Sequence, residues 1–190
     1  MKKTFINPFL VAFLFGILGL HLVREFNARR LTAPPALVEV PDWELTSHEN
    51  KPFGSKDLKG KVVITSFFFT RCPTICPKMT QSMLEVQKRF TKLKDKSAFL
   101  TITIDPEFDT PEVLSDFRLK YDTNWTYLTG AKKDILSVVE GKMKLPMGDG
   151  HHVAELVLFD QVGDLRGKFG TDPTSLAALE RAAKHLIDNP

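Results

Sequence analysis

The chain has 190 residues, which is room for one domain of ordinary size and an appendage. Its hydrophobic content of 43% is enough for a core, and its charged content of 26% is close to that of an average soluble domain. A net charge of +3 is too weak to indicate nucleic-acid binding, and no groove-reading motif is present. We exclude nucleic acid as a partner on these grounds.

Residues 1–30 predict an N-terminal membrane anchor. The apolar stretch 4–23 follows two lysines and has about the 20 residues that cross a bilayer core, and its centre carries no charge. A cleaved signal peptide has a shorter apolar region followed by small residues, whereas Arg24 and Glu25 follow here. We therefore expect one uncleaved transmembrane helix, which residues 31–41, with three prolines, connect to the domain as an extended tether.

Residues 42–190 predict an α/β domain. Residues 42–61 indicate a short strand or hairpin, with turns at Gly54 and Gly60. The β-branched and aromatic run 61–69 is typical of a strand buried on both faces, and a helical pattern follows the two cysteines after it. The later elements are a buried strand at 98–104, a helix at 110–121 with Pro111 in its first turn, a helix at 132–144, strands at 151–159 and 165–169 around Gly163, and a closing helix at 172–188. This order predicts a thioredoxin-like α/β sandwich with a mixed sheet and an inserted helical segment.

The only two cysteines, Cys72 and Cys76, lie between the first buried strand and the helix after it. A structural disulfide there would close a five-residue loop and add only about 2 kcal/mol. Pro77 fits the first turn of the helix, which places Cys76 at or beside the N-cap, where the helix dipole favours thiolates. Arg71 and Lys78 add positive charge on either side. Two thiolates of low pKa could form a reversible disulfide or bind a soft metal ion, and the spacing alone does not separate the two.

A metal site needs a third ligand, and His151 and His152 stand at the start of a strongly apolar strand. Neighbouring residues in a strand point to opposite faces. His152 shares its face with Leu156 and Leu158, whereas His151 shares its face with Glu155. The face of His152 is entirely apolar, so we expect its imidazole to point into the protein and favour it as the ligand.

Two thiolates and one imidazole form a soft site suited to Cu(I), which accepts three ligands. Zinc usually takes a fourth ligand, and no third cysteine exists to supply it. The sulfur atoms of Met79, Met143 and Met147 could assist, but we expect these side chains to be ordinary packing residues.

Three segments, in this order along the chain, resemble the Sco/SenC family of membrane-anchored, copper-binding, thioredoxin-like proteins: FFFTRCPTICPKM, ITIDPEFDTPEVL and GDGHHVAELVLFDQVGDL. The resemblance extends from around residue 40 to the C-terminus. It implies that Cys72, Cys76 and His152 bind copper, as Cu(I) and with Cu(II) as a further state. The family's usual Asp-His-Ser is His151-His152-Val153 here, so a second imidazole lies beside the expected ligand and could exchange with it.

The second of these segments contains two aspartates close to the expected site. Asp105 ends a predicted strand. Asp109 precedes Thr110 and Pro111, a pattern typical of a helix start, so we expect Asp109 to cap that helix. Tuning of the metal site is the alternative role for Asp109.

The resemblance implies a membrane-anchored assembly factor that delivers copper to the Cu-A centre of cytochrome c oxidase, or prepares its thiols. Exposure of the site at a loop would permit ligand exchange with the copper-bearing subunit or with another copper chaperone. The alternative is a thiol-disulfide oxidoreductase, with Cys72 attacking and Cys76 resolving. We expect the cell inner membrane, with the domain in the periplasm, or else the mitochondrial inner membrane facing the intermembrane space.

Overall fold

The computed structural model describes residues 16–19, 35–146 and 154–190. The chain divides into two units, residues 1–32 and 33–190. The described part of the first unit is a single short turn of helix. Among the residues that the structure describes, no helix is both long and apolar enough to cross a membrane. Most of the predicted anchor falls outside those residues, so the anchor stays a prediction.

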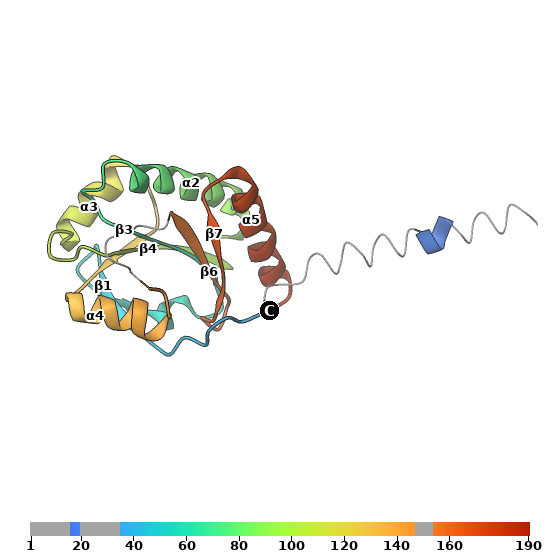
Figure 1. Ribbon diagram of the computed structural model, residues 1–190, viewed down its shortest axis with the longest axis horizontal. Coiled ribbons are helices and arrows are strands. Elements are labelled where there is room, and N and C mark those ends of the chain that lie inside the picture. The colour runs from blue at the N-terminus through green and yellow to red at the C-terminus, as the bar shows by residue number, and fades with distance from the viewer. Residues whose placement is uncertain (1–15, 20–34, 147–153) are drawn as a thin grey trace, which may run out of the picture. The chain divides into compact units, whose positions relative to one another are not determined.

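The second unit is built on a mixed sheet with the strand order β2-β1-β5-β4-β3-β6-β7 in its described part (Figure 1). The strands are β1 (Glu44–Ser47), β2 (Pro52–Gly54), β3 (Val62–Phe68), β4 (Ser97–Thr103), β5 (Thr126–Thr129), β6 (Glu155–Phe159) and β7 (Leu165–Gly170). The central strands β3, β4 and β5 run parallel to one another, whereas the outer strands are antiparallel to their neighbours. The predicted closing hairpin is confirmed, as β6 and β7.

Helices cover both faces of this sheet and create two hydrophobic cores (Figure 1). The helices are α2 (Ile75–Arg89), α3 (Pro111–Lys120), α4 (Lys132–Leu136) and α5 (Pro173–Asp188), with the 3-10 turns η1 (Ser55–Leu58) and η2 (Thr91–Leu93) and the π-helical turn η3 (Ser137–Lys142). We name the side of α2, α3 and α5, which includes Ile64 and Leu179, the α2 core. The side of α4 and η3, which includes Val63 and Ile135, is the α4 core. Successive residues of β3 therefore serve opposite cores, as the alternation along a strand requires.

The elements agree with the sequence predictions in order and type, with two exceptions. β5 lies in segment 125–130, for which the sequence predicted no strand, because four residues carry too little periodic pattern. The predicted helix 132–144 is instead a short α-helix followed by the π-helical turn, in which the N–H of Met143 donates to the carbonyl of Val138. Gly141 and the β-branched residues before it are poor helix formers, which weakens a regular helix there.

Candidate metal centre

Cys72 and Cys76 lie in and just after the turn that connects β3 to α2, at the carboxyl end of the parallel strands. Cys72 is 6% exposed and Cys76 is 1% exposed, and both belong to the α2 core. The turn between them is open, because Pro73, Thr74 and Ile75 are exposed. The thiols are therefore less accessible than a site on an exposed loop would be, although the turn between them faces solvent.

The start of α2 differs from the prediction by two residues. Thr74 is the N-cap residue and Cys76 is the second residue of the helix, so the prediction that Cys76 lies at or beside the N-cap is wrong. Pro77 falls in the first turn as predicted, where its missing N–H leaves no helical hydrogen bond unmade. The first-turn N–H groups instead converge on Cys72, whose Sγ accepts a hydrogen bond from the amide of Cys76 at 3.4 Å.

These hydrogen bonds make Cys72 the more acidic thiol. Burial is the largest single influence and would raise its pKa. The backbone N–H groups of Thr74, Ile75 and Cys76, together with the Cys76 thiol, act in the opposite direction and lower the pKa of Cys72 below its ordinary value. Hydrogen bonds to a charged form favour that form, so the thiolate of Cys72 is stabilised.

Cys76 has the opposite character. The pKa of the Cys76 thiol is raised to about 12, mainly by burial and in part by the neighbouring Cys72 sulfur and the Asp109 carboxylate. A hydrogen bond at the backbone of Phe69 works against this shift but does not balance it. The prediction of two thiolates with low pKa is confirmed for Cys72 and wrong for Cys76, because the loss of water outweighs the helix dipole.

Arg71 does not point its charge at the thiols. Its Nη2 pairs with Oδ2 of Asp105 at 2.6 Å, and its guanidinium lies over the ring of Phe108, 4.3 Å from the centroid. Phe108 is 43% exposed. The predicted positive charge beside Cys72 is therefore paired with a carboxylate, and backbone N–H groups stabilise the thiolate instead.

Asp109 is fully buried, and the prediction that it caps the following helix is wrong. Thr110 is the N-cap of α3, with its side chain accepting a hydrogen bond from the amide of Val113. The Asp109 carboxylate accepts hydrogen bonds from the amide of Thr70 at 3.1 Å, from the Thr70 hydroxyl and from the Thr103 hydroxyl. It thus connects the turn before Cys72 with the end of β4.

The two candidate histidines, His151 and His152, lie outside the described residues. The strand β6 begins after them at Glu155 and pairs antiparallel with β3, so β6 starts beside the carboxyl end of β3. Leu156 and Leu158 belong to the α2 core, whereas Val157 belongs to the α4 core. Both faces of β6 are therefore buried. The alternation of side chains along this strand thus decides which of the two cores a residue joins, not whether it is buried or exposed to solvent. Within the described part of the chain, no three His, Cys, Asp or Glu side chains could together hold a metal ion.

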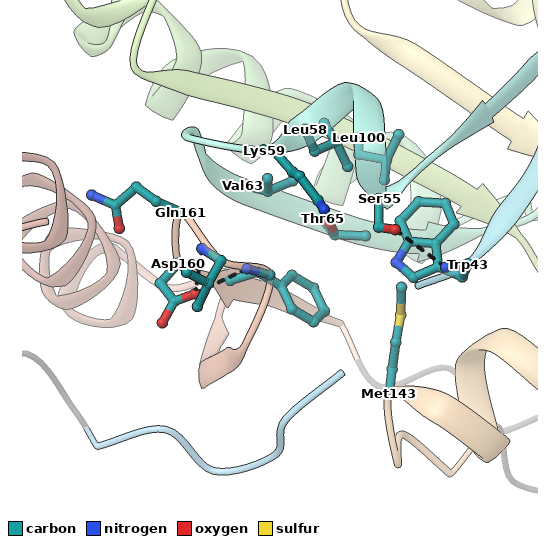
Figure 2. A pocket seen from close by; sticks show the side chains of 13 residues that line it. Trp43, Ser55, Leu58, Lys59, Val63, Thr65, Leu100, Met143, Asp160 and Gln161 are labelled. Atoms are coloured by element: carbon teal, nitrogen blue, oxygen red, sulfur yellow. Dashed lines mark hydrogen bonds between the residues drawn. The ribbon is translucent and has the colours of Figure 1, made fainter. Parts of the chain in front are cut away.

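A cavity on the opposite face of the sheet is not part of this centre (Figure 2). It has an empty volume of about 370 Å³ that includes space open to solvent, and it is lined by Trp43, Thr65 and Met143 among others. Its lining includes neither thiol nor histidine. Met143 is 1% exposed in the α4 core, and Met79 is 2% exposed in the α2 core, so both pack as core residues.

Comparison with known proteins gives the same family throughout. The family model for SCO1/SenC matches residues 32–186. A candidate copper-binding protein of Stutzerimonas stutzeri is 30% identical over 162 residues, which cover 79% of this chain and 78% of the relative. The SCO1 homologue of Bacillus subtilis is 34% identical over 99 residues, which cover 50% of this chain and 51% of the relative, so that match spans about half the length of either chain.

Solved structures agree with these sequence matches. A SCO1/SenC family lipoprotein from Bacillus anthracis is 32% identical with a TM-score of 0.70, covering 80% of this chain and 96% of that one. ScoI of Bradyrhizobium japonicum, with copper bound, is 28% identical with a TM-score of 0.64, covering 77% of this chain and 96% of that one. The predicted thioredoxin-like α/β fold with a mixed sheet is confirmed, and the chain belongs to the SCO1/SenC family.

Proposed function

We propose that this chain binds copper through Cys72, Cys76 and His152 and passes it to a partner during assembly of cytochrome c oxidase. The observation that carries the proposal is the pair of free thiols one turn apart, with the amide of Cys76 donating to Cys72 Sγ. Two soft sulfur ligands at this spacing suit Cu(I). The copper-bound ScoI and the copper-binding candidate from S. stutzeri support copper as the cargo.

The third ligand in this proposal is His152. It stands three residues before Glu155, the first residue of β6, and β6 begins beside the carboxyl end of β3. Counted in steps of two along the sequence, His152 is in phase with Leu156 and Leu158, which pack in the same core as both cysteines. His151 is out of phase with them and serves as the matched control for a test.

Copper uptake is coupled to the loss of a proton in this site. Cys76, with its pKa raised to about 12, carries a proton at neutral pH, whereas the lowered pKa of Cys72 makes that thiol the easier one to ionise. Binding of one Cu⁺ as a copper bis-thiolate therefore releases the Cys76 proton, together with the Cys72 proton wherever Cys72 is not already ionised. Acid therefore favours release, and a partner's thiolates can replace the two sulfur ligands one at a time along the exposed turn.

The recipient in this proposal is the copper-bearing subunit of cytochrome c oxidase, at its Cu-A centre, or another copper chaperone. Membership of the SCO1/SenC family supports this assignment. The apolar stretch 4–23 would anchor the chain in the cell inner membrane with the domain in the periplasm, and the mitochondrial inner membrane is the alternative. In an oxidising compartment the two thiols can form a disulfide, and this disulfide must be reduced before the pair can bind copper.

Titration of the reduced full-length chain in detergent with Cu(I), against a competing chelator, tests the metal site. We expect one copper ion per chain, loss of high-affinity binding in Cys72→Ser and Cys76→Ser, and weaker binding in His152→Ala but not in His151→Ala. Unchanged affinity in both cysteine variants would refute the copper site. Weaker binding in His151→Ala alone would move the third ligand to that residue.

A thiol-disulfide oxidoreductase is the second candidate, because the two thiols differ in acidity. A nucleophilic thiolate paired with a protonated thiol is the arrangement of an attacking and a resolving cysteine. Cys72 would then attack a partner's disulfide, and Cys76 would displace the partner by forming the Cys72–Cys76 disulfide. We expect Cys76→Ser to accumulate a mixed disulfide with a model substrate and Cys72→Ser to form none. Failure of the unsubstituted chain to reduce that substrate would remove this candidate.

A further inference from the structure

Asp109 lies next to the thiol site, and its position is not explained by a role as a helix cap. β3 and β4 run parallel with Phe68 beside Thr103, and both strands end there. The N–H of Ile104 donates to the carbonyl of Phe68 at 2.8 Å, which continues the pairing by one residue. Asp109 lies just beyond this point and accepts hydrogen bonds from the Thr103 hydroxyl at the end of β4 and from Thr70 in the turn after β3.

The contacts of Asp109 fix the turn that carries Cys72. Thr70 stands two residues before Cys72 and donates both its amide and its hydroxyl to the same carboxylate. The N–H of Cys72 donates to the carbonyl of Phe69 at 3.2 Å, so the chain is held from Phe69 to Cys72. A displacement of Asp109 would therefore move the first sulfur ligand.

The carboxylate also places a buried negative charge in the site. Asp109 is 0% exposed, and the donors that contact it are an amide and two hydroxyls, all of them neutral. The nearby guanidinium of Arg71 pairs with Asp105 instead. The Asp109 carboxylate is also among the causes that raise the pKa of the Cys76 thiol.

This charge has a direct consequence for a copper complex. Two thiolates and one Cu⁺ carry a net charge of −1, which a neutral imidazole does not change. A like charge held in a buried, weakly screened position destabilises such a complex. The same carboxylate would thus orient the ligand loop and weaken its hold on copper.

We propose that Asp109 is a positioning residue of the thiol site that holds the Cys72 loop through Thr70 and, by its buried charge, keeps Cu(I) exchangeable. The inference rests on the proposed copper function. It assigns a role in transfer to a residue that binds no metal itself. The hydrogen-bonding role and the charge role change copper affinity in opposite directions, which makes them separable.

The test compares Cu(I) affinities of full-length variants by competition with a chelator at fixed pH. Asp109→Asn keeps the shape and an acceptor oxygen for Thr70 but removes the charge, so we expect about 10-fold tighter binding. Thr70→Val removes a donor to the carboxylate while the charge stays, so we expect weaker binding, by about 3-fold to 10-fold. Thr70→Ser, which keeps the hydroxyl, and Asp116→Asn, which removes an exposed charge from α3, are the matched controls and should bind as the unsubstituted chain does.

Opposite shifts in the two variants support the proposal, because a purely structural role of Asp109 would weaken binding in both. Unchanged or weaker binding in Asp109→Asn overturns it, and so does unchanged binding in Thr70→Val. The melting transition shows whether Asp109→Asn folds. If it does not, Thr103→Val replaces it and is compared with Thr70→Val. The proposal is overturned if both of these variants bind Cu(I) with the affinity of the unsubstituted chain. Failure of the unsubstituted chain to bind Cu(I) would instead refute the proposed function, and this inference with it.

Discussion

The affinity for Cu(I) is expected to rise about tenfold for each pH unit between about pH 7 and pH 9 because of one buried thiol. The pKa of Cys76 is raised to about 12, so this thiol keeps its proton over the whole range and each copper ion must displace it. Cys72, with its lowered pKa, contributes progressively less to the proton release as the pH rises. The Cys76 proton alone gives a tenfold slope, and the Cys72 proton makes the slope steeper at the lower end of the range.

The size of this effect follows from the two pKa values. At pH 7, removing the proton from a thiol of pKa about 12 costs about 7 kcal/mol, compared with about 3 kcal/mol for an ordinary thiol of pKa 9.0. The raised pKa of Cys76 thus adds about 4 kcal/mol, or about a thousandfold, to the cost of removing the proton that copper must displace at neutral pH. A site of this kind takes up copper with less affinity than two exposed thiols but releases it more readily to a competing thiolate.

The measurement is a Cu(I) competition titration at several pH values, with the chelator's own protonation taken into account. Cys72→Ser retains the buried thiol and should keep the slope, although its affinity is lower. Cys76→Ser removes the displaced proton and should lose the slope above the pKa of Cys72. A flat pH dependence in the unsubstituted chain would show that Cys76 either binds as a thiol or is not a ligand, and would refute this reasoning.

Three further predictions concern stability, measured by chemical denaturation. Met83→Ala, at a 0% exposed position of α2, should lower the free energy of unfolding by about 2–5 kcal/mol, whereas Leu119→Ala, at 71% exposure, should change it by less than about 0.5 kcal/mol; equal effects would contradict the described packing. Thr110→Ala should cost about 1 kcal/mol by removing the N-cap of α3, and Thr110→Ser should restore it; no loss in Thr110→Ala would contradict the cap. Because the pKa of Cys76 is higher in the folded chain, the free energy of unfolding should fall as the pH rises from about 9 to about 12. The fall should be smaller in Cys76→Ser. Parallel curves of unfolding free energy against pH for the two proteins would contradict the raised pKa.

The central part of the fold could be predicted from the sequence because its segments carry strong patterns. β3 is a run of mainly β-branched and aromatic residues, and six of its seven residues are buried. α2 begins near Pro77 and presents Met79 and Met83 to the core at the expected helical spacing. β5 could not be predicted in the same way, because its four residues become a strand only by pairing with β1 and β4.

The electrostatics of the site depended on contacts that no local pattern contains. The helix dipole was a sound argument for Cys72, but Cys76 lies in the α2 core, and its burial there outweighs the dipole. Asp109 reads as a helix cap in sequence because Thr110 and Pro111 follow it. Its partner Thr70 is 39 residues away, so the hydrogen bonds appear only in three dimensions.

The contrast between the two thiols arises from where each lies relative to the start of α2. Cys72 precedes the helix, so the first-turn N–H groups point toward its sulfur, whereas Cys76 is inside the helix and faces the core. This asymmetry serves either chemistry: it gives a redox pair an attacking thiolate and a protected resolving thiol, and it gives a copper carrier a ligand that a proton can displace. Both functions therefore use the same thiol pair, and the third ligand separates them. An imidazole near both sulfurs strengthens copper binding but has no required part in thiol exchange. The comparison of His152→Ala with His151→Ala is for that reason the most informative measurement on this chain.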